Sequence, residues 1–427
     1  MPSKQELLEE VARLRAENDL LKKKCNKIST LPLNREEYRR YGRQMQVPEF
    51  GGLNAQVKLK NSKLLVIGAG GLGCPALLYL AAAGIGQIGI VDHDTVDITN
   101  LHRQVIHDTN TVGMFKAESA QIKIQALNPN VKVVTYCEAL TNTNCFDIVE
   151  SYDIVLDCTD NPASRYLIND TCVLLGKTIV SGSGLKTEGQ LSILNFHNKG
   201  PCYRCFYPKP PPPNSVTSCS DGGVIGPCIG LLGVMMAIEA LKCLTEFYTD
   251  ENFRPFLALY SGYSPQQKLR TFKMRGRSPT CEVCKADCRK VTRKLIESGK
   301  IDYENWCGSL NYEVLDSNTE RISAKQLAQI DFGVPTINPL IDVRPEEQYD
   351  IAHLDHSINI PYAQLSQTDF LPESIDPTKP TYVICRFGRD SQLSTKALQN
   401  RLANVKDVIG GLDAWQREVD SDFPVYW

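Results

Sequence analysis

The sequence predicts an α/β protein: a doubly wound, mostly parallel sheet followed by a second, smaller α/β domain. Short apolar runs of strand length alternate with helix-like segments from residue 63 onward, which is typical of βαβ units and parallel sheets. The glycine-rich turn Gly68–Gly73 follows the first of these runs, and a second strand–helix series begins at Arg321. These three observations divide the chain into two folded parts.

Composition and charge are those of a soluble globular protein. The chain has 427 residues, of which 42% are hydrophobic and 22% charged, and its formal net charge is −2. That charge argues against direct nucleic-acid binding. The longest apolar run, 229–241, contains Glu239 and is expected to be a buried helix. With no signal peptide and 16 cysteines that include two C-x-x-C pairs, we expect a cytosolic protein without membrane association.

Residues 1–30 are expected to form an N-terminal helix. Apolar or small residues recur there at heptad spacing: Leu7, Leu14, Leu21 and Ile28 at one position, Val11, Asn18 and Cys25 at the other. Both a coiled coil and a helix packed on its own domain fit this pattern.

The first domain is expected at 31–290, a linker at 291–318 and the second domain at 319–427. In the first domain we expect strands at 63–67, 87–91, 131–136, 153–157, 178–181 and 189–196, and helices at 74–83, 116–127 and 161–175. Five prolines in the six residues 208–213 predict an exposed, stiff break. In the second domain we expect strands at 340–343, 381–385 and 405–409 and a helix at 391–403.

The glycine-rich turn predicts a nucleotide site. It lies between a strand and a helix, and Asp92 ends the next strand, where an acid binds the ribose of NAD. On this motif alone, an NAD-dependent oxidoreductase fits as well as an ATP-using enzyme.

Further polar residues beside predicted strand ends and helix starts favour ATP: Asn100, Arg103, Gln104, Lys116, Asp160 and Arg165. Cations neutralise a triphosphate, and an acid holds the Mg²⁺ that polarises it, whereas hydride transfer needs neither. Each of these residues taken singly is more often a solvated surface group, so the prediction rests on their joint placement.

Four cysteines predict a structural zinc site. Cys202, Cys205, Cys281 and Cys284 form two C-x-x-C pairs, a donor set that suits tetrahedral Zn²⁺ and leaves no ligand position open for water. One ion per chain would join two segments that are distant in sequence.

Two other cysteines are candidate nucleophiles. Cys219 lies in a polar loop between the proline run and Gly222-Gly223, where a thiol can reach a substrate, although such a cysteine is more often structural. Cys385 ends a predicted strand, and a loop and a helix start follow it: Arg386, Phe387, Gly388, Arg389, Asp390 and Ser391. The backbone N–H groups of such a loop stabilise a thiolate or persulfide. A cysteine phosphatase would carry arginine six positions after the cysteine, where this chain has Ser391.

The first domain resembles the ubiquitin-activating family, especially the bacterial molybdopterin-synthase and thiamine-thiazole adenylyltransferases. The resemblance is carried by Tyr41–Gln44, Gly68–Gly73, Asp92–Asp94, Asn100–Gln104 and Asp157–Asn161. It implies an ATP site made of Gly68, Gly70, Gly71, Gly73, Asp92, Asp94, Thr99, Asn100, Leu101, His102, Arg103, Gln104, Lys116, Asp160 and Asn161. In it, Asp92 holds the ribose, Asp160 serves Mg²⁺, and Arg103 and Lys116 contact phosphates. The resemblance also implies a homodimer in which Arg43 reaches the ATP of the partner subunit, and an acyl-accepting role for Cys219.

The second domain resembles rhodaneses through Leu340–Pro345, the Cys385 loop and Gly410–Trp415. Together the two resemblances imply adenylation of the C-terminal glycine of a ubiquitin-like sulfur carrier, followed by sulfur transfer from a Cys385 persulfide to give a thiocarboxylate. A cysteine desulfurase or sulfurtransferase would supply the sulfur, and tRNA wobble-uridine thiolation, protein conjugation or molybdopterin synthesis would use it. A carrier-binding scaffold with a degenerate nucleotide site is the alternative from another class of protein.

Overall fold

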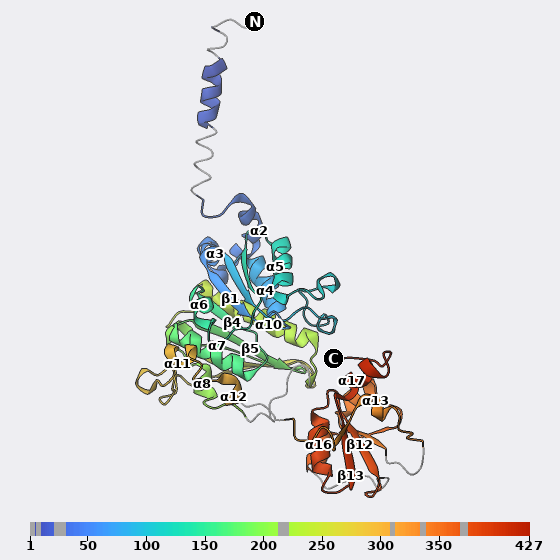
Figure 1. Cartoon of the computed structure of the whole chain (residues 1–427). Helices are drawn as coiled ribbons and strands as arrows, with labels where there is room; N and C mark the ends of the chain where they lie inside the picture. The colour runs from blue at the N-terminus through green and yellow to red at the C-terminus, as the bar shows by residue number, and fades with distance from the viewer. Residues whose placement is uncertain are drawn as a thin grey trace. The chain divides into compact units, whose positions relative to one another are not determined.

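The chain folds into two compact units, Met1–Gly308 and Ser309–Trp427 (Figure 1). The computed structural model describes residue 5 and residues 10–20, 31–211, 222–307, 312–333, 339–367 and 375–427. Each unit has its own sheet, so the two-domain expectation is confirmed.

The first unit is built on an eight-stranded sheet in the order β3-β2-β1-β4-β5-β6-β7-β8. Its strands are β1 (Lys63–Ile67), β2 (Gln87–Val91), β3 (Lys132–Tyr136), β4 (Ile154–Asp157), β5 (Thr178–Leu185), β6 (Glu188–Leu194), β7 (Phe256–Ser261) and β8 (Lys268–Lys273). The five strands from β3 to β5 pair in parallel, and the remaining pairs are antiparallel. The doubly wound, mostly parallel fold is therefore confirmed, and the hairpin β7–β8 is an addition that the sequence pattern did not indicate.

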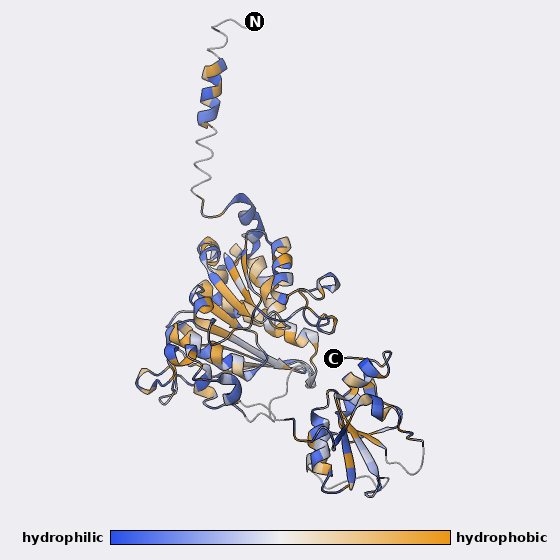
Figure 2. Cartoon of the chain, in the orientation of Figure 1, coloured by the Kyte–Doolittle hydropathy of each residue, from blue (hydrophilic) through white to orange (hydrophobic). Residues whose placement is uncertain are grey.

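Helices cover both faces of this sheet. Leu64 and Val66 of β1 share one core with α4 (Gly73–Ala83), α5 (Lys116–Leu127) and α10 (Gly226–Leu244), while Leu65 and Ile67 share another with α6 (Cys145–Glu150) and α7 (Pro162–Leu174). Because successive side chains of a strand point to opposite faces, a strand buried on both faces is apolar throughout. Figure 2 shows this apolar character in the central strands.

Helix α10 is long and apolar enough to cross a membrane by length and composition alone. It packs on α4, β5 and β6, and Leu232, Met236 and Ala240 on its inner face are fully buried. The expectation of a buried core helix is confirmed.

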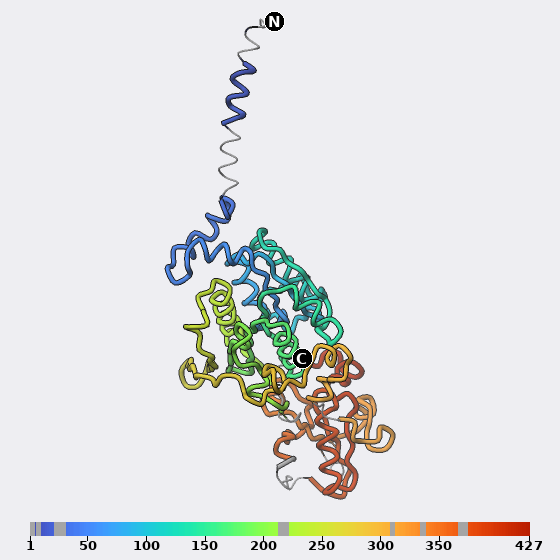
Figure 3. Tube along the Cα trace, turned by 90° about the vertical axis from the view of Figure 1, so that its left-hand side faces the viewer, coloured from blue at the N-terminus to red at the C-terminus, as the bar shows by residue number. Residues whose placement is uncertain are grey.

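Helices α2 (Arg35–Met45) and α3 (Gly52–Asn61), blue in Figure 3, lead into β1. Tyr41 of α2 is buried, and its hydroxyl accepts a hydrogen bond from the Asn128 amide at 2.8 Å. Residues 10–20 form a separate helix in which every residue is exposed, including Val11 and Leu14. Leu7, Leu21, Cys25 and Ile28 lie outside the described residues, so the coiled coil stays a prediction.

The expected linker at 291–318 needs correction, because its first part belongs to the first unit. Helices α11 (Arg293–Glu297) and α12 (Tyr303–Cys307) lie there, and Ile296 and Tyr303 join the core around Cys281. The Tyr303 hydroxyl donates to Asp170 of α7 at 2.8 Å, and the same carboxylate holds Arg204. Most residues of these short helices are polar, so their composition indicated a linker although Ile296 and Tyr303 are buried.

The second unit is a five-stranded, all-parallel sheet in the order β11-β10-β12-β13-β9. Its strands are β9 (Arg321–Ile322), β10 (Leu340–Asp342), β11 (Ser357–Asn359), β12 (Pro380–Ile384) and β13 (Asn404–Val408). Its helices are α13 (Ala324–Leu327), α14 (Glu346–Ile351), α15 (Tyr362–Gln367), α16 (Asp390–Leu398) and α17 (Gly411–Glu418). The three longer predicted strands and the helix after Cys385 are confirmed.

Tyr303→Phe should lower the free energy of unfolding of the first unit by roughly 1.5–3 kcal/mol, because it leaves the buried Asp170 carboxylate without one donor. Denaturant unfolding checks this, with Tyr263→Phe, at an exposed tyrosine, as the matched control. Equal stability of the two variants would contradict the assignment of residues 292–307 to this unit.

Candidate functional site

A cavity of about 500 Å³ opens at the carboxyl ends of the central parallel strands. Ile67 at the end of β1, Val91 at the end of β2 and Cys158 just after β4 line it. The strand order reverses between β1 and β4, so this is the topological switch point where doubly wound sheets bind ligands. Its volume lies within the range of about 300–1,000 Å³ that small-molecule sites occupy.

The glycine-rich turn shapes one wall of this cavity. Gly68 has φ +97°, and a Cβ atom there would lie 2.8 Å from the Cys158 carbonyl oxygen. At Gly73 a Cβ atom would lie 2.0 Å from the carbonyl oxygen of Gly68. Only glycine permits both approaches, and they bring the start of α4 against the ends of β1 and β4.

Asp92 fixes the same turn from the end of β2. One of its carboxylate oxygens accepts the Ala69 N–H at 2.7 Å and the other accepts the Asp94 N–H at 2.9 Å. The Asp92 carboxylate lines the cavity.

Cations and an acid gather around the cavity, as the sequence predicted. Lys116 begins α5, is largely buried, and donates from Nζ to Asp94 at 2.7 Å. The predicted residues among its lining are Gly68, Gly70, Gly71, Asp92, Asp94, Arg103, Gln104, Lys116, Asp160, Asn161 and Arg165. Cations and exposed carboxylates, among them Asp160, therefore line one cavity.

Hydrogen bonds hold the lining in place, and some predicted residues lie outside it. Asn100 accepts from Arg103 at 2.7 Å and from Gln104 at 3.2 Å, so it orients both side chains. Asn161 lines the cavity, and its amide oxygen caps α7 by accepting the Ser164 N–H. Gly73, Thr99, Leu101 and His102 also lie outside the cavity lining.

Arg43 is exposed on α2 and does not line the cavity of its own chain. Cys219 lies outside the described residues.

Arg165 holds the loop that follows β4 and contains Asp160. Its guanidinium donates to the Gly182 carbonyl at 2.9 Å, to Asp157 at 3.3 Å and also to the Thr159 carbonyl. This buried network ties the ends of β4 and β5 to α7 and holds the loop at the cavity edge.

The sequence argument missed some residues of the site. His107 is buried, with one ring nitrogen 2.9 Å from the Ser119 hydroxyl and the other 3.0 Å from the Ala69 carbonyl oxygen. Burial lowers the pKa of His107, so the neutral ring holds the glycine turn against α5. Ser183, Gln190 and Tyr203 complete the cavity wall. Only the tertiary fold brings them there, because they come from β5, β6 and the start of α8 (Tyr203–Phe206).

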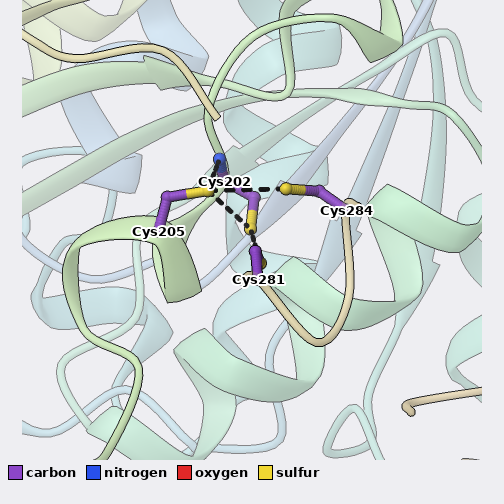
Figure 4. Close-up of side chains that lie close together, drawn as sticks. All are labelled: Cys202, Cys205, Cys281 and Cys284. Atoms are coloured by element: carbon purple, nitrogen blue, oxygen red, sulfur yellow. Dashed lines mark hydrogen bonds between the residues drawn. The ribbon is translucent and has the colours of Figure 1, made fainter. Parts of the chain in front are cut away.

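The four predicted metal ligands meet as Figure 4 shows: Cys202 directly precedes α8, Cys205 lies within it, and the other two lie on a loop near residue 280. The measured sulfur–sulfur distances are 3.8 Å from Cys202 to Cys205, 3.6 Å from Cys202 to Cys281 and 3.4 Å from Cys205 to Cys284. Tetrahedral Zn–S bonds of about 2.3 Å require sulfurs roughly 3.8 Å apart, so the cluster fits a metal ion of this kind. Hydrogen bonds among the thiols raise the pKa of Cys202 and lower that of Cys281.

Cys385 is 3% exposed and lies directly after β12 in the second unit. Its sulfur accepts the Arg389 N–H at 3.3 Å and lies 3.2 Å from the Ser391 hydroxyl oxygen. Burial raises the pKa of the Cys385 thiol, and these hydrogen bonds act in the opposite direction.

The loop after Cys385 is fixed by the strand–helix joint beside it. The Leu412 N–H donates to the Cys385 carbonyl at 2.9 Å, and Gly388 has φ +70° where a Cβ atom would lie 2.6 Å from the Gly410 nitrogen. The guanidinium groups of Arg386 and Arg389 lie near the Phe387 ring, at 4.5 and 5.7 Å from its centre. Backbone N–H groups and the Ser391 hydroxyl make the direct contacts.

The fold and these sites define a class: a nucleotide-binding α/β enzyme joined to a domain that carries a reactive cysteine at a strand–loop–helix turn. Comparison with known proteins agrees. The model of the ThiF family matches residues 41–283, and that of the rhodanese-like domain matches residues 323–418.

The adenylyltransferase and sulfurtransferase uba4 of Ogataea parapolymorpha is 58% identical to this chain, over 93% of this chain and 100% of the relative. The protein of the same name from Candida albicans is 54% identical, over 100% of this chain and 99% of the relative. The solved structure of the microcin C7 biosynthetic enzyme MccB with N-formylated MccA has a TM-score of 0.51 at 24% identity, covers 57% of this chain and 74% of that chain, and shares the fold. This chain belongs to the ThiF family, with a rhodanese-like domain, and is an adenylyltransferase and sulfurtransferase. The oxidoreductase and scaffold alternatives are thereby set aside.

Lys116→Ala should weaken ATP binding about 10- to 150-fold, the equivalent of roughly 1.5–3 kcal/mol for a hydrogen bond to a charged group. Without the ammonium group, Asp94 is left unpaired beside the phosphates. Isothermal titration calorimetry measures the change, with Lys123→Ala, at an exposed position of the same helix, as the matched control. Equal affinity of the two variants would remove Lys116 from the site.

Proposed function

We propose that this enzyme adenylates the C-terminal glycine of a ubiquitin-like sulfur carrier and then converts it to a thiocarboxylate with sulfur carried on Cys385. The observation that carries the proposal is one chain holding both a switch-point cavity lined by Lys116 and Asp160 and a buried cysteine in a loop of N–H donors. Activation and sulfur delivery each have a suitable site.

In the first step a carboxylate oxygen of the carrier attacks the α-phosphorus of ATP, and pyrophosphate leaves. Lys116 and Arg103 lie on the cavity wall where they neutralise charge that develops on the phosphates. Asp160 is an exposed acid of the cavity lining that would hold Mg²⁺, which neutralises the triphosphate when bound. Asp92 would hold the ribose.

The carrier's C-terminal residues have a route to this cavity. A second cavity of about 130 Å³ shares Arg165, Ser183, Gln190 and Tyr203 with the first and is also lined by Phe206 and Tyr207. So small a space admits glycine residues and excludes large side chains. This supports a carrier ending in Gly-Gly.

In the second step the terminal sulfur of the Cys385 persulfide attacks the carbonyl carbon of the adenylate, AMP leaves, and an acyl disulfide joins the carrier to Cys385. A thiolate, for which Cys219 is the candidate, would then attack the Cys385 sulfur, so that the thiocarboxylate leaves and a disulfide remains for an external thiol to reduce. The role of Cys219 rests on the resemblance of its loop to that of ubiquitin-activating enzymes. A cysteine desulfurase or another sulfurtransferase would load Cys385. The thiolated carrier would serve tRNA wobble-uridine thiolation, protein conjugation or molybdopterin synthesis in the cytosol.

We further propose a homodimer in which Arg43 reaches the ATP of the partner subunit. Its support is that Arg43 is exposed and outside its own cavity, although it belongs to the matched Tyr41–Gln44 motif. The four-cysteine cluster is proposed to hold one structural Zn²⁺ per chain. Its ligands would come from two segments that the chain separates by more than seventy residues, so that the ion joins them.

Cys385→Ala should retain carrier-dependent exchange of labelled pyrophosphate into ATP and make no thiocarboxylate when thiosulfate is supplied. Activation needs only the nucleotide cavity, whereas transfer needs the sulfur on Cys385. Mass spectrometry of the carrier detects the product by a gain of about 16 Da, the replacement of oxygen by sulfur in thiolate chemistry. Cys288→Ala, at a cysteine outside both sites, is the control. Wild-type amounts of product from Cys385→Ala would overturn the assigned route.

Metal analysis of the purified protein should find about one Zn²⁺ per chain, since four thiolates complete one tetrahedral shell. Cys281→Ser should lose the metal and lower the thermal stability of the first unit, because the two segments are no longer joined. Cys145→Ser, which changes a buried cysteine outside the cluster, should keep the metal. An intact wild-type protein without zinc would refute this assignment.

A further inference from the structure

A buried carboxylate stands behind the reactive cysteine of the second unit. Asp407 lies in β13, next to β12, whose end carries Cys385. Ser391 in the first turn of α16 lies between them. Its hydroxyl oxygen is 3.2 Å from the Cys385 sulfur, and its side chain also interacts with the Asp407 carboxylate. Ser391 and Asp407 are both 0% exposed.

One oxygen of this carboxylate is bound and the other is available. Oδ2 accepts a hydrogen bond from Arg321 of β9 at 2.6 Å. Oδ1 accepts no hydrogen bond of ordinary geometry from any residue that the structure describes. A buried carboxylate oxygen without a partner is costly, and such groups call for an explanation.

We propose that Asp407 removes the thiol proton of Cys385 through the Ser391 hydroxyl. The S–H proton passes to the Ser391 oxygen while the Ser391 hydroxyl proton passes to the Asp407 carboxylate, with which the Ser391 side chain interacts. The products are a thiolate and a carboxylic acid, and no electrons are exchanged. The thiolate then attacks the sulfane sulfur of a donor such as thiosulfate, so that an S–S bond forms on Cys385 and sulfite leaves.

This path is favoured because it leaves the net charge of the buried site unchanged. A buried thiol that lost its proton to bulk water would add a charge to a dry site, which is strongly unfavourable. Transfer to Asp407 moves the negative charge from carboxylate to sulfur and leaves the net charge of the site unchanged. Arg321 remains beside the pair throughout.

The charged groups around the pair are consistent with this role. Burial raises the pKa of Asp407, against the opposing effects of Ser391 and Arg321, which makes the carboxylate a stronger base than an exposed aspartate. Asp390, at the start of α16, raises the pKa of the Cys385 thiol in addition to burial. The loop cations Arg386 and Arg389 lie near Phe387.

The test is the pH dependence of sulfur transfer from thiosulfate to cyanide by the full chain, followed as thiocyanate. Asp407→Asn and Ser391→Ala should each slow the reaction at pH 7 on the order of 100-fold, the usual effect of losing a general base. Near pH 10 both should approach the wild-type rate, because hydroxide then removes the proton. Ser391→Ala removes only a hydroxyl group and serves if Asp407→Asn fails to fold.

Asp342→Asn is the matched control, because Asp342 is a buried carboxylate of the same sheet that pairs with Arg344. It should lower thermal stability and leave the shape of the pH profile unchanged. A wild-type rate for Asp407→Asn at pH 7, or a loss that persists equally at pH 10, would overturn the proposal.

The inference rests on the proposed role of Cys385, and one further variant separates the two. Cys385→Ala should form no thiocyanate at any pH. If it remains active, the proposed function fails at its sulfur carrier; if it is inactive while Asp407→Asn is unaffected, only the proton path fails.

Discussion

The close approach of the glycine turn to its neighbours is the constraint on which the nucleotide site depends. The turn between β1 and α4 passes so near the Cys158 carbonyl that residue 68 has no room for a side chain, and Gly73 packs equally closely on Gly68. This brings the start of α4 to the place where the strand order reverses. Two contacts then hold the turn: the Asp92 carboxylate accepts the Ala69 N–H, and a ring nitrogen of His107 is hydrogen-bonded to the Ala69 carbonyl oxygen. The cavity forms where the backbone at Gly68 meets the backbone at Cys158, and its polar side chains surround this contact.

Buried ion pairs serve a similar purpose elsewhere in the chain. Arg165 joins Asp157 to the backbone of two strand ends, and Arg204 joins Asp170 to α12. Burying a charge is favourable only when its partners are in place, so such pairs fix one arrangement more than they add stability. The Arg165 network fixes the loop that contains Asp160. The Arg204–Asp170 pair fixes the segment that carries Cys202 and Cys205.

The two reactions of this enzyme need different electrostatic surroundings. Adenylation places several negative phosphate groups in one cavity, whose lining at the ends of the parallel strands includes the cations Arg103, Lys116 and Arg165. Sulfur transfer needs a single anion on a nearly inaccessible atom, and the Cys385 sulfur is contacted by the Arg389 N–H and the Ser391 hydroxyl. Separate sheets allow each environment to form without compromising the other. Both sites nonetheless lie at the carboxyl ends of parallel strands, since that edge presents N–H groups and loops together.

The sequence by itself determined the fold class, most strand positions and the residue types of all three sites. Local patterns carried this information: alternating strand and helix lengths, the glycine turn, the paired C-x-x-C motifs and the strand–loop–helix around Cys385. The tertiary structure alone decided that residues 292–307 belong to the first unit, that Tyr203 and Gln190 line the cavity, and that Asp407 stands behind Cys385. These features depend on contacts between residues far apart in sequence, and no local pattern marks them. A polar residue such as Asp407, in a short strand, reads as exposed until the neighbouring strand and helix are known to enclose it.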